Sequence, residues 1–411
     1  MTTKPTFKKS ILLSGFCAVL FAAVLFVLFF SDTFRGQSEG TPLQIYADKI
    51  FTKCSQTGYA PSCYDKEIPK LMDVISMEQA FKVARFIQEK DSRYIECHVL
   101  GHHLSEREVA KDPAAWKDVV TRCPVSMCNN GCHHGALMAR FGNETEVLSF
   151  TQIEEIKSDL ADVCEPRGIW NPTEVERSMC YHAIGHLNMY VTGANINRSV
   201  KICEDIGTKK DGRNYIQTCT EGVLMSVYQP LGPEDVALVK DIRPKKEEVN
   251  SFCAKYTGMA FFACHKESWP LFMEEIVEPR GLVEFCSYTD ESFPQTNCYA
   301  SVMNILTILF VVNEENLDKL KNFCTGLPKE RVGLCFAQAA RRLMQIDPVY
   351  YADRAGAVCR AAETARVGKE CYEELADYAS LSFHAGSKEF TQYCNTLPFP
   401  WDKKCLHETT F

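Results

Sequence analysis

The sequence predicts an all-α protein, a solenoid of disulfide-stapled helix–turn–helix repeats after one N-terminal transmembrane helix. Three observations predict it. Residues 11–30 are twenty positions without a charge, the cysteines of the remaining chain recur in couples, and amphipathic helical patterns flank those couples. Few segments show the alternation of β-branched residues that is typical of strands, so a sheet is not expected.

The apolar segment at residues 11–30 is long enough for a signal anchor. At about 1.5 Å per residue, a helix of that length spans a hydrocarbon core of about 30 Å. Three lysines lie within residues 1–10, whereas Asp32 and Arg35 cancel on the other side. The positive-inside rule therefore predicts a cytoplasmic segment 1–10, a single-pass membrane anchor 11–30, and an extracytoplasmic remainder in a periplasm, at a cell surface or in a secretory lumen. A cleavable signal peptide is the alternative, although the sequence from Phe29 to Asp32 is a poor cleavage site.

Composition restricts the partners of the chain. The net charge is −8 and no cluster of Lys and Arg interrupts it, which argues against nucleic acid. Of the 21 cysteines, Cys17 lies in the predicted anchor, and the other twenty form an even set. An even set in an exported chain predicts disulfide bonds in an oxidising compartment.

Most cysteines fall into couples whose members are 11 to 16 residues apart. The first members recur at steps of 39, 50, 33, 38, 35 and 35 residues, and a period in the thirties is typical of a helix–turn–helix repeat. Each couple would staple the end of one helix to the start of its partner. The predicted couples are Cys164 and Cys180, Cys203 and Cys219, Cys253 and Cys264, Cys286 and Cys298, Cys324 and Cys335, Cys359 and Cys371, and Cys394 and Cys405.

Two further couples are closer, and two cysteines are left over. Nine residues separate Cys54 from Cys63 and Cys123 from Cys132. Cys97 opens a helical pattern without a first member, and Cys128 lies in a loop. We predict that Cys97 and Cys128 join and cross-link neighbouring repeats.

The period and the cysteine placement resemble the Sel1-like and tetratricopeptide repeat class, including its secreted, disulfide-stapled members. The resemblance covers roughly residues 45–411 and implies a curved solenoid whose groove binds partners. The predicted organisation after the anchor is a linker at 31–44, N-terminal repeats with the histidines at 45–270, and C-terminal repeats at 271–411.

Seven of the ten histidines lie between residues 98 and 186, close behind cysteines. The motif HxxGH occurs twice, at His98–His102 and at His182–His186. A spacing of four places two imidazoles on one helix face, where they can share a metal ion. The intervening Gly101 and Gly185 each cost about 0.5–1 kcal/mol relative to Ala inside a helix. Glycine there indicates close approach of a neighbouring helix, a metal shell or a flat cofactor.

Neighbouring repeats carry matching polar residues, because His134 and Glu221 stand in the register of His182. Stacked helices about 8–10 Å apart can converge such side chains on one site. The predicted metal ligands are His98, His102, His134, His182, His186 and Glu221. His103 and His133 are left open, and ordinary structural roles are expected for His265, His384 and His407.

Two kinds of cofactor fit these ligands. Imidazole and carboxylate suit Zn, Fe or Cu, and two histidines can also hold haem. Covalent c-type haem is disfavoured, because three residues separate Cys128 from Cys132 where the usual motif has two.

The leading hypothesis is a membrane-anchored, extracytoplasmic helical-repeat protein that binds a metal ion or haem through these histidines, with a redox or metal-dependent enzymatic role left open. No GxSxG, P-loop or dinucleotide motif points to another chemistry. The alternative is a non-catalytic scaffold that binds a protein or glycan in its solenoid groove, with the histidines incidental.

Overall fold

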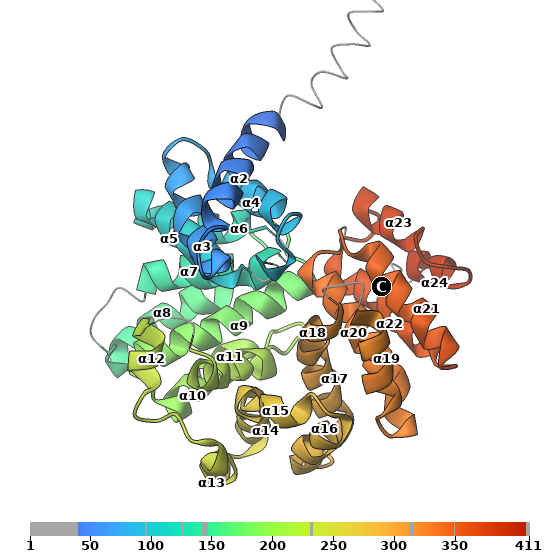
Figure 1. Cartoon of the computed structure of the whole chain (residues 1–411). Coiled ribbons are helices and arrows are strands. Elements are labelled where there is room, and N and C mark those ends of the chain that lie inside the picture. The colour runs from blue at the N-terminus through green and yellow to red at the C-terminus, as the bar shows by residue number, and fades with distance from the viewer. Residues whose placement is uncertain are drawn as a thin grey trace, which may run out of the picture.

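The computed structural model describes residues 40–94, 97–124, 127–141, 147–230, 233–311, 316–348 and 350–407. Over these residues the chain is helical, and β pairing is restricted to two isolated bridges, Arg167 with Trp170 and Thr208 with Asn214. The prediction of an all-α protein is therefore confirmed (Figure 1).

The N-terminal part of the described chain contains the helices that carry the histidine cluster. These helices are α2 (Gly40–Cys54), α3 (Ala60–Glu67), α4 (Met77–Gln88), α5 (His98–Lys111), α6 (Trp116–Arg122), α7 (Gly131–Phe141), α8 (Phe150–Asp162), α9 (Glu174–Val191), α10 (Ile196–Gly207), α11 (Ile216–Tyr228), α12 (Pro233–Val239), α13 (Val249–Cys253) and α14 (Gly258–Glu267). Because α2 begins at Gly40, residues 40–44 of the predicted linker are helical.

The C-terminal part continues the same alternation of shorter and longer helices. Its helices are α15 (Met273–Ile276), α16 (Pro279–Phe285), α17 (Gln295–Leu306), α18 (Ile308–Val311), α19 (Leu317–Thr325), α20 (Val332–Ile346), α21 (Ala352–Thr364), α22 (Gly368–Ser382), α23 (Lys388–Cys394) and α24 (Trp401–His407).

The start of α9 shows how local sequence fixes a helix that carries site residues. Thr173 and Glu176 form a capping box: the Thr173 amide donates to Glu176 Oε2 at 2.6 Å, and the Glu176 amide donates to Thr173 Oγ1 at 3.3 Å. Two amides that the first helical turn leaves without partners are satisfied in this way. The cap sets the start of α9 and hence the positions of His182 and His186 along it.

The longer helices pack in series. In the N-terminal part α5 contacts α7, α7 contacts α9, α9 contacts α11, and α11 contacts α14. In the C-terminal part α17 contacts α20, and α20 contacts α22. Shorter helices flank this series, as α10 does against α9 and α11. Figure 1 shows α7, α9 and α11 lying side by side.

The series of helices bends back on itself. Helix α22 contacts α9, and α20 contacts the short helix η4 (Met127–Asn130) that precedes α7. Arg85 of α4 also forms an ion pair with Asp347, which follows α20. The C-terminal helices thus pack against the N-terminal part, and a solenoid with an open groove is not confirmed.

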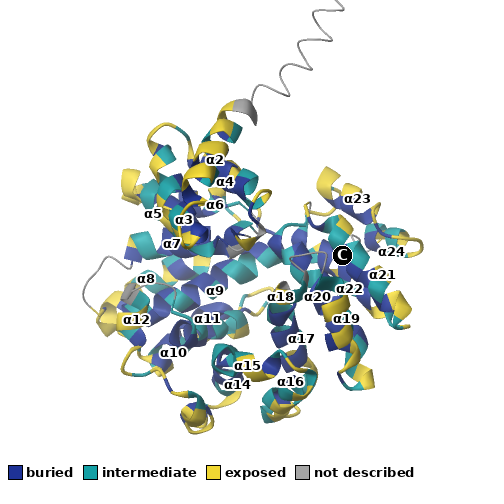
Figure 2. Ribbon diagram, in the orientation of Figure 1, coloured by how far each residue is buried: buried dark blue, intermediate teal, exposed yellow. Residues whose placement is uncertain are grey.

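Buried apolar residues form two clusters, one from Leu43 to Cys264 and one from Phe262 to Cys405. Figure 2 shows that the helices near the centre of the molecule, including α9 and α11, are mostly buried or half-buried. Most cysteines belong to these clusters, so the disulfides lie inside the packing between helices rather than at its margin.

The described chain contains ten disulfide bonds, and every one has the predicted pairing, including Cys97 with Cys128. A disulfide typically stabilises a fold by about 2–4 kcal/mol, chiefly by restricting the unfolded chain. Disulfides persist in oxidising environments, and a set of this size is typical of them.

The predicted localisation as a single-pass membrane protein is corrected by the structure. Across the residues that the structure describes, no helix combines the length and the apolarity needed to cross a membrane. The longer helices there bury one face against neighbouring helices, instead of presenting apolar side chains all round. The segments predicted as cytoplasmic N-terminus and anchor, residues 1–10 and 11–30, lie outside the described residues.

Candidate metal centre

Five of the predicted ligands converge at one place, from three successive helices of the series. His98 and His102 come from α5, His134 from α7, and His182 and His186 from α9. The ring centroid of His134 lies 4.7 Å from that of His98 and 4.6 Å from that of His186. His134 therefore lies between the two HxxGH pairs.

The five histidines form two sets of three that share His134. One set is His98, His102 and His134, the other is His134, His182 and His186, and within each set the potential ligand atoms lie within 4.8 Å of one another. We call them the α5 subsite and the α9 subsite.

Each HxxGH pair has the spacing that one metal ion requires. The Nε2 atoms of His98 and His102 are 3.1 Å apart, and those of His182 and His186 are 3.3 Å apart. Two nitrogens bound to a tetrahedral Zn²⁺ at about 2.0–2.1 Å lie about 3.3 Å from each other. Both pairs thus match two ligands of one ion.

Glycines let the site helices approach each other closely. A Cβ at Gly185 would stand 2.0 Å from the carbonyl oxygen of Cys219 on α11, and a Cβ at Gly222 would stand 2.1 Å from the carbonyl oxygen of His182. Gly101 meets the backbone of α7 in the same way, 2.7 Å from the amide nitrogen of Cys132. Of the three explanations predicted for these glycines, the neighbouring helix is the one observed.

The tautomer of His182 follows from its partner on α11. Its Nδ1 lies 3.3 Å from the backbone carbonyl oxygen of Thr218. A carbonyl oxygen can only accept a hydrogen bond, so Nδ1 carries the ring hydrogen and donates it. The Nε2 atom of neutral His182 is therefore left with an unshared lone pair.

His186 also has its partner on α11. Its Nδ1 is 2.8 Å from Ser226 Oγ, and the Ser226 hydroxyl is within reach of the carbonyl oxygen of Gly222 at 3.1 Å. When that hydroxyl donates to Gly222, Oγ can accept from an Nδ1–H of His186, which is the tautomer that a metal ion on Nε2 requires. In this tautomer the Nε2 atoms of His182 and His186 each offer a lone pair to a shared ion.

A carboxylate accompanies the corresponding pair on α5. Glu106 Oε1 lies 4.0 Å from His102 Nδ1, one turn further along the helix. A carboxylate at this position favours hydrogen on Nδ1 and leaves Nε2 directed toward His98. Metal-binding histidines commonly have such a carboxylate behind them.

Burial keeps the imidazoles in the neutral form that binds metals. It lowers the pKa of His182 to about 4, although the nearby Glu221 carboxylate partly opposes the shift. Burial and the neighbouring imidazoles also hold the pKa values of His102, His134 and His186 well below the usual range. The His102 side chain is nevertheless 20% exposed, so the cluster borders solvent at this residue.

Glu221, the sixth predicted ligand, belongs to neither subsite. Its Oε2 pairs with Lys266 Nζ at 2.7 Å, and its Oε1 accepts a hydrogen bond from Gln217 at 2.9 Å. Lys266 also pairs with Glu267 at 3.1 Å. The Glu221 carboxylate, which the sequence predicted as a metal ligand, is thus paired with the ammonium group of Lys266 on α14.

The other histidines lie apart from the two subsites. His103 is exposed, and its Nδ1 is 3.2 Å from the carbonyl oxygen of Asp65. Burial lowers the pKa of His133 to about 4, and the His265 ring stacks on Tyr288 with centroids 4.6 Å apart. The two exposed histidines of the C-terminal part are His384 and His407.

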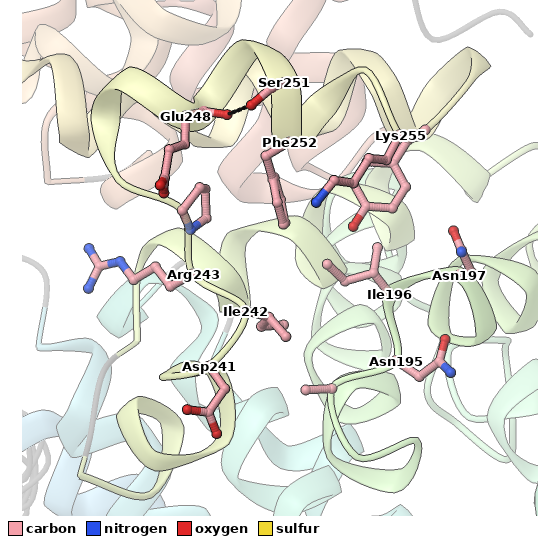
Figure 3. Close-up of a pocket in the computed structure, with 13 residues that line it drawn as sticks. Asn195, Ile196, Asn197, Asp241, Ile242, Arg243, Glu248, Ser251, Phe252 and Lys255 are labelled. Carbon is pink, nitrogen blue, oxygen red and sulfur yellow. Dashed lines mark hydrogen bonds between the residues drawn. The ribbon is translucent and has the colours of Figure 1, made fainter.

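A surface hollow of about 550 Å³ lies away from the histidines (Figure 3). The start of α10 and the segment that leads into α13 line it, with Asn195, Asp241, Arg243 and Lys255 among the side chains. These side chains mix both charges, and no histidine is among them. The hollow and the metal centre are therefore separate features.

Helix α11 supplies residues that the sequence pattern did not single out. Thr218 and Ser226 hold the two α9 imidazoles, and Met225 Sδ lies 3.3 Å from His182 Nε2. The available signal was the spacing of Gly222 and Ser226, which places both on the face of α11 that meets α9.

Comparisons with known proteins offer no relative whose ligands could be transferred to this chain. No family model matches it, and neither does any curated protein or solved structure. The assignment of the five histidines therefore rests on the distances and hydrogen bonds of the site itself.

Proposed function

We propose that this protein binds a transition-metal ion through His98, His102, His134, His182 and His186. The relationship between His182 and His186 carries the proposal, because their Nε2 atoms are 3.3 Å apart while both Nδ1 atoms are engaged elsewhere. With hydrogen on both Nδ1 atoms, each Nε2 atom has a lone pair, and one metal ion between them can bind both.

A bare ion is better supported than haem. The glycines that could have made room for a macrocycle instead meet the backbone of the next helix, as Gly185 meets Cys219. The His134 ring also lies within 4.6–5.9 Å of the rings of His182 and His186, so imidazoles occupy the centre of the cluster. Imidazole ligands suit Zn, Cu and Fe, and we propose an ion of this group.

The shared histidine sets the expected stoichiometry. Each ring nitrogen of His134 can bind one ion, so a second ion needs the other ring nitrogen of the same residue. We expect one tightly bound ion per chain and a weaker second ion. Loss of His134 should weaken both subsites, whereas loss of His182 should weaken the α9 subsite alone.

The test is a metal titration of the full chain after chelator treatment. Wild type should bind Zn²⁺ at near-integer stoichiometry. His134→Ala should weaken binding by more than about 100-fold, which exceeds the usual effect of changing a residue that only orients a ligand. His384→Ala is the matched control and should bind like wild type. Circular dichroism should show that each variant keeps its helix content.

Two results would overturn the proposal. One is a wild-type protein that binds neither zinc nor copper, and the other is a His134→Ala variant that binds as tightly as wild type. A redox or metal-dependent enzymatic role and a protein or glycan partner stay predictions.

A further inference from the structure

We infer that Met225 is a sulfur ligand of the α9 subsite and that this subsite selects copper as Cu(I). The inference rests on the proposed function and names the ion of one subsite. Its basis is the contact between Met225 Sδ, on α11, and His182 Nε2, on α9, at 3.3 Å.

This contact is not an ordinary hydrogen bond. The His182 ring hydrogen is on Nδ1, which faces the carbonyl oxygen of Thr218. A thioether sulfur has no hydrogen to donate, so His182 Nε2 and Met225 Sδ meet as two acceptors. His186 Nε2 also lies 3.3 Å from His182 Nε2. The Nε2 atoms of His182 and His186 and the sulfur of Met225, three atoms that can bind an ion, thus gather in one place.

The packing of α11 on α9 brings the sulfur to this place. Gly222 lets the two backbones touch, because a Cβ there would stand 2.1 Å from the carbonyl oxygen of His182. Met225 and Ser226 follow Gly222 by three and four residues, so they lie on the same face of α11. Ser226 orients His186 from this face, and Met225 meets His182 from it.

The chemistry of the donors favours copper over zinc. Thioether sulfur is a soft ligand that selects Cu(I), whereas zinc sites use thiolate, imidazole and carboxylate. The nearest candidate carboxylate, Glu221, is held by Lys266 at 2.7 Å, and both side chains are largely buried. Three neutral imidazoles and one thioether remain. That set leaves the full charge of an ion uncompensated, which suits a monovalent ion better than a divalent one.

The α5 subsite offers an internal contrast. His98 and His102 supply nitrogen, and the carboxylate of Glu106 stands behind His102 at 4.0 Å. The carboxylate favours a divalent ion at the α5 subsite, whereas the α9 subsite has the thioether of Met225. This difference predicts that a substitution of Met225 discriminates between metals.

The experiment compares Met225→Leu with wild type in the full chain. Leucine has nearly the volume of methionine, so the packing between α9 and α11 should persist. Cu(I) affinity is measured with ascorbate and a competing chromophoric chelator, and Zn²⁺ affinity with a competing zinc chelator. Met225→Leu should weaken Cu(I) by at least about tenfold and Zn²⁺ by less than about threefold. Met273→Leu, a half-buried methionine on α15, should change neither.

X-ray absorption of the Cu(I)-loaded protein provides the second readout. Wild type should show a copper–sulfur distance of about 2.3 Å, as in other metal–sulfur bonds, and Met225→Leu should not. Unchanged Cu(I) affinity in Met225→Leu overturns the sulfur ligand while zinc binding leaves the proposed function intact. An equal loss of both metals would mean that Met225 only packs, which also overturns the inference. Failure of wild type to bind either metal overturns the proposed function itself.

Discussion

The Nε2 atoms of His182 and His186 lie 3.3 Å apart on one face of α9. Their orientation is set from α11, because Thr218 and Ser226 contact the two Nδ1 atoms. Helix α11, which has no histidine, thus orients the two histidines of helix α9. Residues that hydrogen-bond to metal-binding histidines orient the rings and tune their basicity.

Ser226→Ala should weaken metal binding without touching a ligand. The substitution removes the acceptor for His186 Nδ1–H, which lies 2.8 Å from Ser226 Oγ, so the His186 ring can adopt either tautomer. We expect a roughly 10–100-fold loss of Zn²⁺ affinity, measured by chelator competition. This is the range for residues that hold a metal ligand in place. Ser380→Ala on α22, whose hydroxyl donates to the carbonyl oxygen of Asp377, is the control. Equal affinities for both variants would contradict the role of Ser226.

Glu221→Gln should affect metal binding far less than His182→Ala. The Glu221 carboxylate is engaged by Lys266, and Lys266 keeps its second partner, Glu267, when Glu221 is neutralised. We expect at most about a tenfold change in Zn²⁺ affinity for Glu221→Gln and more than about a 100-fold loss for His182→Ala. If Glu221→Gln lost affinity as severely as His182→Ala, the Glu221 carboxylate would bind the ion and would not stay paired with Lys266 in the metal-bound protein.

Gly185→Ala should destabilise the fold and weaken the site together. The new Cβ would stand 2.0 Å from the carbonyl oxygen of Cys219, so α9 must move away from α11. Overpacking of this kind costs about 1–3 kcal/mol, and urea unfolding with the disulfides intact measures it. Gly58→Ala is the control, because a Cβ at Gly58 meets nothing within 4 Å. A Gly185→Ala variant as stable as Gly58→Ala would refute the close helix contact.

Local periodicity predicted the parts of the site that lie on one helix or repeat at a fixed period. A spacing of four is enough to pair His98 with His102, and a period in the thirties is enough to pair the cysteines. His134 joined the cluster because its register matches that of His182, and their rings lie 5.9 Å apart. These relationships depend on helix geometry and on neighbouring repeats, which sequence spacing encodes.

Contacts between distant segments could not be predicted in this way. The pairing of Glu221 with Lys266 depends on how α14 rotates against α11, and spacing does not define that rotation. The packing of α22 on α9, which closes the helix series, likewise leaves no periodic pattern. The sequence pattern does not single out Met225 and Ser226, because methionine and serine are common in helices. Only their contacts with His182 and His186 reveal their roles.

His265 should make the fold sensitive to acid. It is 7% exposed and stacks on Tyr288, and burial lowers its pKa to about 4. Below about pH 6.5 the unfolded chain takes up a proton at this residue, whereas the folded chain does so only near pH 4. The stabilisation is therefore complete above about pH 6.5 and is lost as the pH falls toward 4, by about 3 kcal/mol at most.

The substitution His265→Phe isolates this contribution. Phenylalanine keeps the aromatic contacts with Tyr288 and Phe261 but cannot be protonated. Urea unfolding at pH 7 and at pH 4 should show a smaller loss of stability for His265→Phe than for wild type. His384→Gln, at an exposed position, should follow wild type. A wild-type pH profile in His265→Phe would show that this histidine is not the titrating group.

Removing the Cys97–Cys128 disulfide should weaken metal binding as well as the fold. Cys97 precedes His98 at the start of α5, and Cys128 lies just before α7, which carries His134. The bridge therefore joins the two helices of the α5 subsite. The double variant Cys97→Ala/Cys128→Ala should lose about 2–4 kcal/mol of stability and also lose Zn²⁺ affinity, because His134 is no longer tied to His98.

The disulfide between Cys394 and Cys405 provides the control, since it joins α23 to α24 and touches no site helix. It spans 11 residues, whereas Cys97 and Cys128 are 31 apart, so chain entropy makes its removal cost about 1 kcal/mol less. Cys394→Ala/Cys405→Ala should therefore be destabilised but bind Zn²⁺ like wild type at a temperature where both variants are folded. If the two double variants lost affinity equally, general loosening of the fold would explain the effect. If neither lost affinity, the packing of α5 on α7 would be sufficient to hold the ligands, and the bridge would stabilise the fold without organising the metal centre.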